Sequence, residues 1–284
     1  MSTSVDQAFV RQYEMDVHEA FQRQGSKLMN TVRTKTGVVG KSTTFQVIGK
    51  GTATTKARHG IIPPMNQQHT PVDCFLEDLY AGDWVDKLDE LKLNIDEREA
   101  VARGGAMACG RAVDDQIITK LDSTSQTAIT FTYTSIATIL GSFLAVTEQL
   151  NENDVPDDGQ RWGLLTPHAW SAAMVVPQFA SADFVGSDLP FPGAAGRQVR
   201  TWLGVNWMMH TGLPGVSSAT AKGFGYHRDA VGQAVAQGIA VDITWHGDRA
   251  AHWVNNSVSS GACLIEDTGV IEITINDTTA LPAS

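Results

Sequence analysis

The chain has 284 residues, of which 42% are hydrophobic and 18% are charged, and its formal net charge is −10. This length allows a large buried core, and this composition excludes a chain that is disordered throughout. A predominantly acidic surface disfavours nucleic-acid binding by the molecule as a whole, because carboxylates repel phosphates.

The N-terminus predicts an amphipathic helix over residues 4–24. Apolar residues recur there at every fourth position, in the order Val5, Phe9, Tyr13, Val17 and Phe21. Such a single apolar stripe must be covered, so we expect the helix to dock on its own chain or on a neighbour. We expect no signal peptide, since the first residues lack a basic stretch followed by an apolar core, and no segment approaches the roughly 20 apolar residues of a membrane span. We therefore expect a soluble protein made in the cytoplasm.

The charge is unevenly distributed along the chain. Residues 1–72 hold nine Lys and Arg against four Asp and Glu, whereas residues 73–124 and 125–284 have net charges of −7 and −8. No acidic residue occurs from Ala20 to Val72, but eight basic ones do: Arg23, Lys27, Arg33, Lys35, Lys41, Lys50, Lys56 and Arg58. This distribution predicts that the basic segment meets an acidic surface, in its own chain or in another copy.

Residues 31–62 are rich in Thr, Gly, Lys and Val and predict a long β-hairpin or loop, which Pro63 and Pro64 close. The alternation from Thr43 to Ile48 predicts a strand within it. An isolated two-stranded ribbon is only marginally stable in water, so this segment needs a partner surface. Residues Val72–Trp84 predict a further strand that leads into a turn.

The clearest helix is predicted over Ile95–Leu121, with Asn94 as its N-cap and a length of roughly 40 Å at 1.5 Å per residue. Gly104 and Gly105 lower its helix propensity and predict a bend or a close crossing. A second helix is predicted over Thr134–Asn151.

The rest of the chain mixes short strands with one more helix. Trp162–Leu165 predicts a strand, and Pro167 predicts the first residue of a helix. Residues 262–275 predict two strands around a turn at Glu266–Gly269. The fold class is therefore α+β.

We find no sequence signature of a catalytic, cofactor or metal site. His246 and His252 are six residues apart, which does not place two imidazoles on one helical face. The adjacent carboxylates Asp114 and Asp115 are expected to be solvated. The three cysteines, at positions 74, 109 and 263, form no Cys-x-x-Cys motif, and we expect buried, reduced thiols. We predict no enzymatic activity, no cofactor and no metal.

Three stretches, residues 161–186, 196–214 and 225–237, together with the order of the predicted elements, resemble the major capsid proteins of tailed bacteriophages. The resemblance implies the Hong Kong-type capsid fold, which encapsulin shells share. It implies an N-terminal arm at 1–30, an extended β-hairpin loop at 31–70, a peripheral domain with a spine helix at 71–125, an axial domain at 126–244 and a return to the peripheral domain at 245–284.

By this resemblance, the chain forms hexamers and pentamers of an icosahedral shell around phage double-stranded DNA, in a virion assembled in the host bacterial cytoplasm. The implied partners are other copies of the chain, scaffolding, portal and decoration proteins, and packaged DNA contacted without specificity; no membrane is implied. The eight basic residues become candidate inter-subunit contacts. Some family members crosslink a loop Lys to an Asn, but no motif here assigns that role to Lys41, Lys50 or Lys56.

Three alternatives remain open at this point. The first is an encapsulin-like cellular shell with cargo inside. The second is a nucleic-acid-binding protein that uses residues 20–72, although Phe45 is the only aromatic residue between Arg23 and Val72 and stacking platforms are therefore missing. The third is a hydrolase whose site leaves no recognisable motif.

Overall fold

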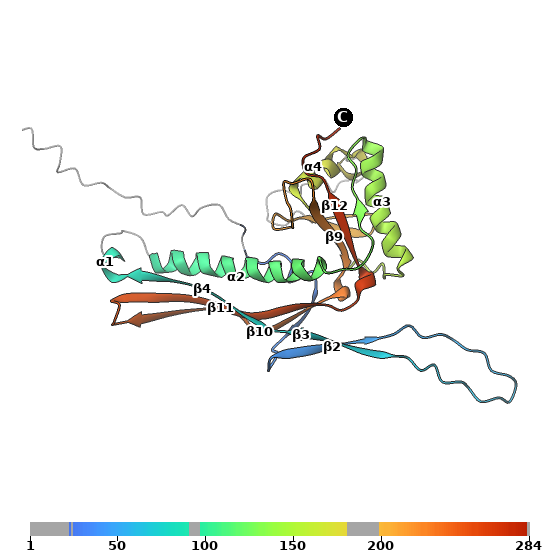
Figure 1. Ribbon diagram of the computed structural model, residues 1–284, viewed down its shortest axis with the longest axis horizontal. Helices are drawn as coiled ribbons and strands as arrows, with labels where there is room; N and C mark the ends of the chain where they lie inside the picture. The colour runs from blue at the N-terminus through green and yellow to red at the C-terminus, as the bar shows by residue number, and fades with distance from the viewer. Residues whose placement is uncertain (1–22, 24, 91–96, 181–198, 283–284) are drawn as a thin grey trace, which may run out of the picture. The chain divides into compact units, whose positions relative to one another are not determined.

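The computed structural model describes residues 23, 25–90, 97–180 and 199–282 (Figure 1). The helix predicted over residues 4–24 falls outside these residues, apart from Arg23, which is not helical. The chain divides into two compact units. We call Met1–Ser26, Asp78–Ala112 and Gly238–Ser259 the small unit, and Lys27–Glu77, Val113–Gln237 and Ser260–Ser284 the large unit. Among the described residues, no helix has the length and apolarity needed to cross a membrane.

The large unit contains a two-stranded hairpin near the start of the chain. Strand β2 (Ser42–Ile48) pairs antiparallel with β3 (His69–Phe75), from Ser42 opposite Phe75 to Ile48 opposite His69. The strand predicted from Thr43 to Ile48 is confirmed. The hairpin predicted over residues 31–62 has different bounds: its second strand begins at His69, and Pro63 and Pro64 lie in the exposed segment between the two strands instead of closing it. The predicted strand Val72–Trp84 is instead two strands, β3 and β4 (Glu77–Asp86), which belong to different sheets: β3 pairs with β2, and β4 pairs with β11.

A four-stranded sheet has the order β1-β10-β11-β4. Strands β10 (Val231–His246) and β11 (Ala251–Leu264) are its longest members. Strand β1 (Arg33–Thr36) runs parallel to β10, with Arg33 opposite Gly232. After β4 comes a short helix, α1 (Lys87–Glu90).

The long helix α2 covers Glu97–Leu121, which confirms the prediction over these residues. Ile95, Asp96 and the expected N-cap, Asn94, lie outside the described residues. The close crossing predicted for the glycine pair is found at Gly105, where an added Cβ would lie 2.1 Å from the Asn256 side chain, whereas Gly104 faces open space. A second close crossing occurs at Gly110, where an added Cβ would lie 2.7 Å from the backbone of Gly25. Small residues on α2 therefore let backbone and side chains approach the helix axis.

A six-stranded sheet in the large unit has the order β5-β12-β9-β6-β8-β7. Its strands are β5 (Ile129–Thr130), β6 (Arg161–Leu165), β7 (Val199–Trp202), β8 (Val205–Met209), β9 (Ala221–His227) and β12 (Val270–Ile275). Strand β9 is antiparallel to both β12 and β6, while β8 is parallel to β6. Two 3₁₀ turns, Arg228–Ala230 and Asp267–Gly269, precede β10 and β12, and the latter is the turn predicted at Glu266–Gly269.

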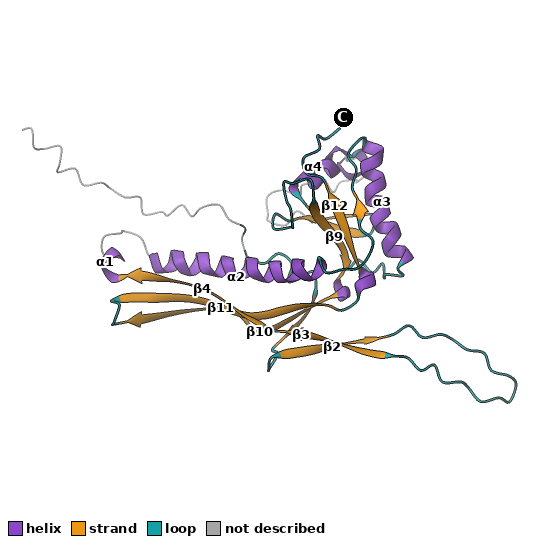
Figure 2. Ribbon diagram, viewed as in Figure 1, coloured by secondary structure: helices purple, strands orange, loops and turns teal. Residues whose placement is uncertain are grey.

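Helices α3 (Ile136–Glu152), α4 (Pro167–Val175) and α5 (Pro177–Ala180) belong to the same unit, where α3 and α4 lie against the sheet (Figure 2). Helix α3 begins two residues later than predicted, because Ser135 forms a capping box with Thr138. Helix α4 begins at Pro167 as predicted, with the Thr166 hydroxyl accepting from the Ala169 N–H at 3.2 Å.

The core between these helices and the sheet is aromatic. Phe143 of α3 makes edge contacts with Phe131 and Trp207 at 4.9 Å and with Trp202 at 5.2 Å between ring centroids. Trp207 occupies the space left by Gly163, where an added Cβ would lie 2.2 Å from its ring. Burying a side chain of this size stabilises the fold by about 1.5–3 kcal/mol.

A smaller cluster holds the base of the hairpin. It consists of Phe45, Cys74, Ala234 and Cys263, all buried. The third cysteine, Cys109, is also buried, and none of the three is disulfide-bonded. The expectation of buried thiols is confirmed.

Candidate assembly interface

The hairpin is anchored at its base and exposed at its end. On β2, Thr43 and Phe45 are buried, while Thr44 and Gln46 face solvent. Beyond the strands, residues 49–68 form a segment that we call the distal loop, and nearly all of it is exposed. Ile61 and Ile62 are 94% and 73% exposed within it. Neighbouring apolar side chains that remain in water mark a surface that another molecule covers.

Two of the predicted basic residues brace the hairpin base inside the chain. The Arg33 guanidinium lies over the Phe45 ring, 5.8 Å from its centroid. The Lys35 ammonium donates to the Thr43 hydroxyl at 2.7 Å. These contacts fix the direction in which β2 leaves the sheet.

Arg23 and Lys27 hold the start of the basic segment against α2. Arg23 donates to the Arg111 carbonyl at 3.1 Å, and Arg111 donates to the Arg23 carbonyl at 3.2 Å. Lys27 acts through its backbone, because its N–H and that of Leu28 donate to the Asp114 carboxylate at 3.0 and 3.1 Å.

Asp114 corrects the sequence prediction. It was expected to be solvated beside Asp115, but it is fully buried, and so is His210, whose Nε2 lies 3.3 Å from Asp114 Oδ2. The Gly212 N–H donates to His210 Nδ1 at 3.2 Å, so the ring proton sits on Nε2 and points to the carboxylate. A signal was present in the sequence, since Asp114 lies one turn from Ile117 and Ile118 on the apolar face of the helix.

Lys50 reaches an acidic residue of its own chain at the beginning of the distal loop. Its ammonium lies 2.8 Å from Asp154 Oδ2, with side chains 78% and 77% exposed. The shared hydrogen bond lowers the pKa of Asp154 and raises that of Lys50. Because water and salt screen an ion pair that is this exposed, the pair contributes little to the stability of the fold. Lys41, Lys56 and Arg58 are also exposed.

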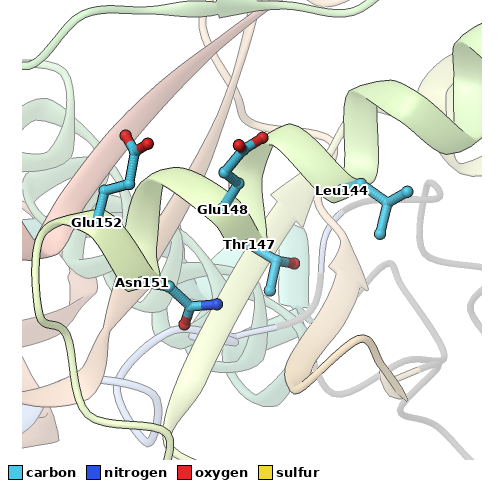
Figure 3. A pocket seen from close by; sticks show the side chains of 5 residues that line it. All are labelled: Leu144, Thr147, Glu148, Asn151 and Glu152. Atoms are coloured by element: carbon cyan, nitrogen blue, oxygen red, sulfur yellow. The ribbon is translucent and has the colours of Figure 1, made fainter.

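An acidic face that could receive such cations lies on α3. Leu144, Thr147, Glu148, Asn151 and Glu152 line a shallow hollow there, and Glu148 and Glu152 project from the same side of the helix (Figure 3). The two carboxylates are one turn apart, and Leu144 beside them is exposed. The arrangement offers two negative charges next to an apolar contact.

His246 and His252 do not converge on a common point. His246 packs edge-on against Trp84 at 5.0 Å, while His252 packs against Trp245 at 4.8 Å. Over the described part of the chain, no group of three or more His, Cys, Asp or Glu side chains is placed to hold a metal ion.

Comparison with models of protein families identifies the family of this chain. The family model described as phage capsid protein matches residues 5–277, which is nearly the whole chain. The chain belongs to the phage capsid protein family. It is a major capsid protein of a bacteriophage with the Hong Kong-type fold, as the sequence predicted. The encapsulin and nucleic-acid-binding alternatives are not favoured.

Solved structures carry the same fold at low sequence identity. A chain from Mycobacterium phage Che8 aligns with a TM-score of 0.72 and 17% identity, over 96% of this chain and 98% of its own. A chain from the capsid of cyanophage P-SCSP1u also reaches 0.72, with 15% identity over 99% and 96%. A chain from the capsid of Ralstonia phage GP4 reaches 0.67, with 11% identity over 100% and 99%. No curated protein sequence gives a significant match.

Proposed function

We propose that this capsid protein assembles into hexamers and pentamers of an icosahedral shell that encloses phage double-stranded DNA. The observation that carries the proposal is the distal loop, which holds basic residues and no acidic ones and leaves Ile61 and Ile62 in water. A lone molecule gains nothing from such a loop, whereas a ring of identical subunits covers it once per copy.

In this proposal the hairpin is a strap that lies over the adjacent subunit. Residues 1–30 act as the N-terminal arm and 31–70 as the extended loop, 71–125 and 245–284 build the peripheral domain, and 126–244 build the axial domain. The strap's cations meet the acidic face of α3 in the neighbouring copy, where Glu148 and Glu152 stand one turn apart. Opposite charges across such an interface set its register and its rate of formation more than its strength.

The protein acts without enzymatic activity and without a cofactor or a bound metal. The shell is assembled in the host bacterial cytoplasm, with scaffolding, portal and decoration proteins as its other partners. Contact with packaged DNA is non-specific, since the acidic surface offers few phosphate contacts.

Charge reversal tests the strap. We expect the triple variant Lys41→Glu, Lys50→Glu, Lys56→Glu to form no shells by electron microscopy, while its far-UV circular dichroism stays close to that of the parent. Lys50 already pairs with Asp154 of its own chain. The double variant Lys41→Glu, Lys56→Glu keeps that pair, so it separates loss of the contact between subunits from loss of the pair within the subunit. Adding Glu148→Lys and Glu152→Lys to the triple variant restores complementary charge, and shells should return in part.

Two results would contradict the proposal at different levels. Normal shells from the triple variant would show that assembly does not need the ionic contacts of the strap, and the assignment as a capsid protein would stand. A parent protein that remains a compact monomer under all assembly conditions tried would overturn the proposal of hexamers and pentamers itself.

A further inference from the structure

Two buried thiols lie together at the base of the hairpin, within the large unit. Cys74 comes from β3 and Cys263 from β11, and they share one cluster with Phe45 and Ala234. Their exposed fractions are 0% and 6%. The two thiols are hydrogen-bonded to each other. A pair of cysteines in direct contact is far from the common case of isolated buried thiols, such as Cys109.

The backbone around the pair is closely packed. The N–H groups of Ala234 and Gly232, two positions apart on β10, donate to the sulfurs of Cys74 and Cys263. A methyl group added to Gly232 would lie 3.0 Å from the Cys263 sulfur, so the glycine leaves room for it. Nearby, a Cβ on Gly261 would collide with the Phe75 carbonyl oxygen, which places β11 and β3 in backbone contact beside the thiols.

The two thiols differ in acidity. The hydrogen bond from the Cys263 thiol lowers the pKa of Cys74, and the same hydrogen bond, with burial, raises the pKa of Cys263. Since the thiolate is the reactive form and the hydrogen bond favours the Cys74 thiolate, we write the reaction with Cys74 as the attacking sulfur.

We propose that Cys74 and Cys263 are a redox modification site, at which a peroxide-class oxidant forms a reversible intrachain disulfide that ties β3 to β11. The Cys74 thiolate attacks one peroxide oxygen, the O–O bond breaks, and Cys74 becomes a sulfenic acid as the first water leaves. The Cys263 sulfur then attacks the Cys74 sulfur, the S–O bond breaks, and the second water leaves with the Cys263 proton. Two thiols are oxidised and one peroxide is reduced to two waters.

The link fixes the base of the hairpin. In the reduced protein, β3 is held on the sheet by non-covalent packing of Phe45 and the two thiols. In the oxidised protein, β3 cannot separate from β11, so the strands that carry the distal loop are locked in one direction. This consequence concerns the subunit itself and does not depend on the proposed strap contact with a neighbour.

The test treats the full-length, fully reduced protein with hydrogen peroxide under native conditions and then blocks remaining thiols with N-ethylmaleimide after denaturation. We expect a mass lower by two hydrogens, one maleimide in place of three, and a crosslinked peptide that joins residues 74 and 263. Dithiothreitol should restore three reactive thiols. Hydrogen exchange over residues 42–48 and 69–75 should slow several-fold in the oxidised form.

Cys109 provides the matched control, because it is also buried and its S–H donates to the Asn256 carbonyl at 3.8 Å. The variant Cys109→Ser should oxidise like the parent, and Cys263→Ser should leave Cys74 as a sulfenic acid that dimedone labels. The proposal is overturned if native protein keeps three maleimide-reactive thiols, if the disulfide appears only after unfolding, or if the links join separate chains. All three of these outcomes are measured on the unmutated protein, so a variant that fails to fold does not obscure the result.

Discussion

Asp114 fixes the backbone at Lys27 and Leu28 against α2. Its carboxylate accepts the backbone N–H groups of Lys27 and Leu28 and the Nε2–H of His210 inside a fully buried site. A carboxylate is an acceptor at both oxygens, so it satisfies all three donors at once. An amide cannot do so, since half of its polar atoms are donors.

We therefore expect Asp114→Asn to lower the free energy of unfolding by about 2–4 kcal/mol, because at least one buried donor loses its partner. Urea denaturation of the unassembled protein measures the loss, and hydrogen exchange at the amides of residues 27 and 28 should accelerate. Asp115→Asn is the matched control, because Asp115 is exposed on the same helix, and its effect should stay within roughly 0.5 kcal/mol. Equal effects of the two substitutions would show that Asp114 holds nothing in place.

A second carboxylate makes stability depend on pH. Burial alone raises the pKa of Asp267, but hydrogen bonds from Ser125, Gln126 and Thr124 outweigh it and bring the pKa to about 2. A folded-state pKa below the unfolded value adds stability above the unfolded pKa, near 3.9, and this contribution disappears as the pH falls toward 2.

Asp267→Asn should therefore destabilise the protein at pH 7 by roughly 1 kcal/mol, since solvent screens a partly exposed group. The difference between variant and parent should shrink as the pH is lowered from 5 to about 2.5. Urea midpoints measured across this range give the comparison. A difference that is independent of pH would exclude the ionised carboxylate as its source.

At the scale of elements, local patterns predicted helices better than they predicted strand pairing. The start of α4 follows from Thr166 and Pro167, which cap and begin a helix by themselves. Likewise, the two strands around Glu266–Gly269 follow from the turn between them. In each case the residues that decide the element lie within a few positions of it.

Strand β1 could not be predicted from the sequence around it. Its four residues, Arg33–Thr36, are mostly polar, and they become a strand only because β10 lies parallel to them almost two hundred residues later. Strand formation depends on such distant partners more than on local preference. The same reason applies to the candidate interface. The basic residues were visible in the sequence, but the partner that Lys50 finds, Asp154, is set by the fold.

At the scale of the whole molecule, basic residues and exposed apolar residues occur together on the distal loop. The distal loop carries Lys50, Lys56 and Arg58 together with Ile61, Ile62 and Met65, all exposed. The fold of a single subunit uses little of this surface, because the buried clusters contain none of these side chains. Folding and assembly should therefore be separable by altering the loop alone.

Removing the distal loop tests this separation. The Gly49 N–H donates to the Gln68 carbonyl at 2.8 Å, so the two ends already face each other across the hairpin. Replacing residues 50–67 by Asn-Gly closes β2 and β3 with a two-residue turn of the favoured type. The thermal midpoint of the subunit should change by no more than about 4 °C, since no buried side chain is lost. Electron microscopy should find no closed shells.

A second variant has a Gly-Ser segment of the original length in place of residues 50–67. It keeps the length of the loop and removes its side chains, and it should also form no closed shells. If only the Gly-Ser variant forms shells, assembly requires the length of the loop but not its charged residues and isoleucines. If both variants form shells, the loop has no role in assembly.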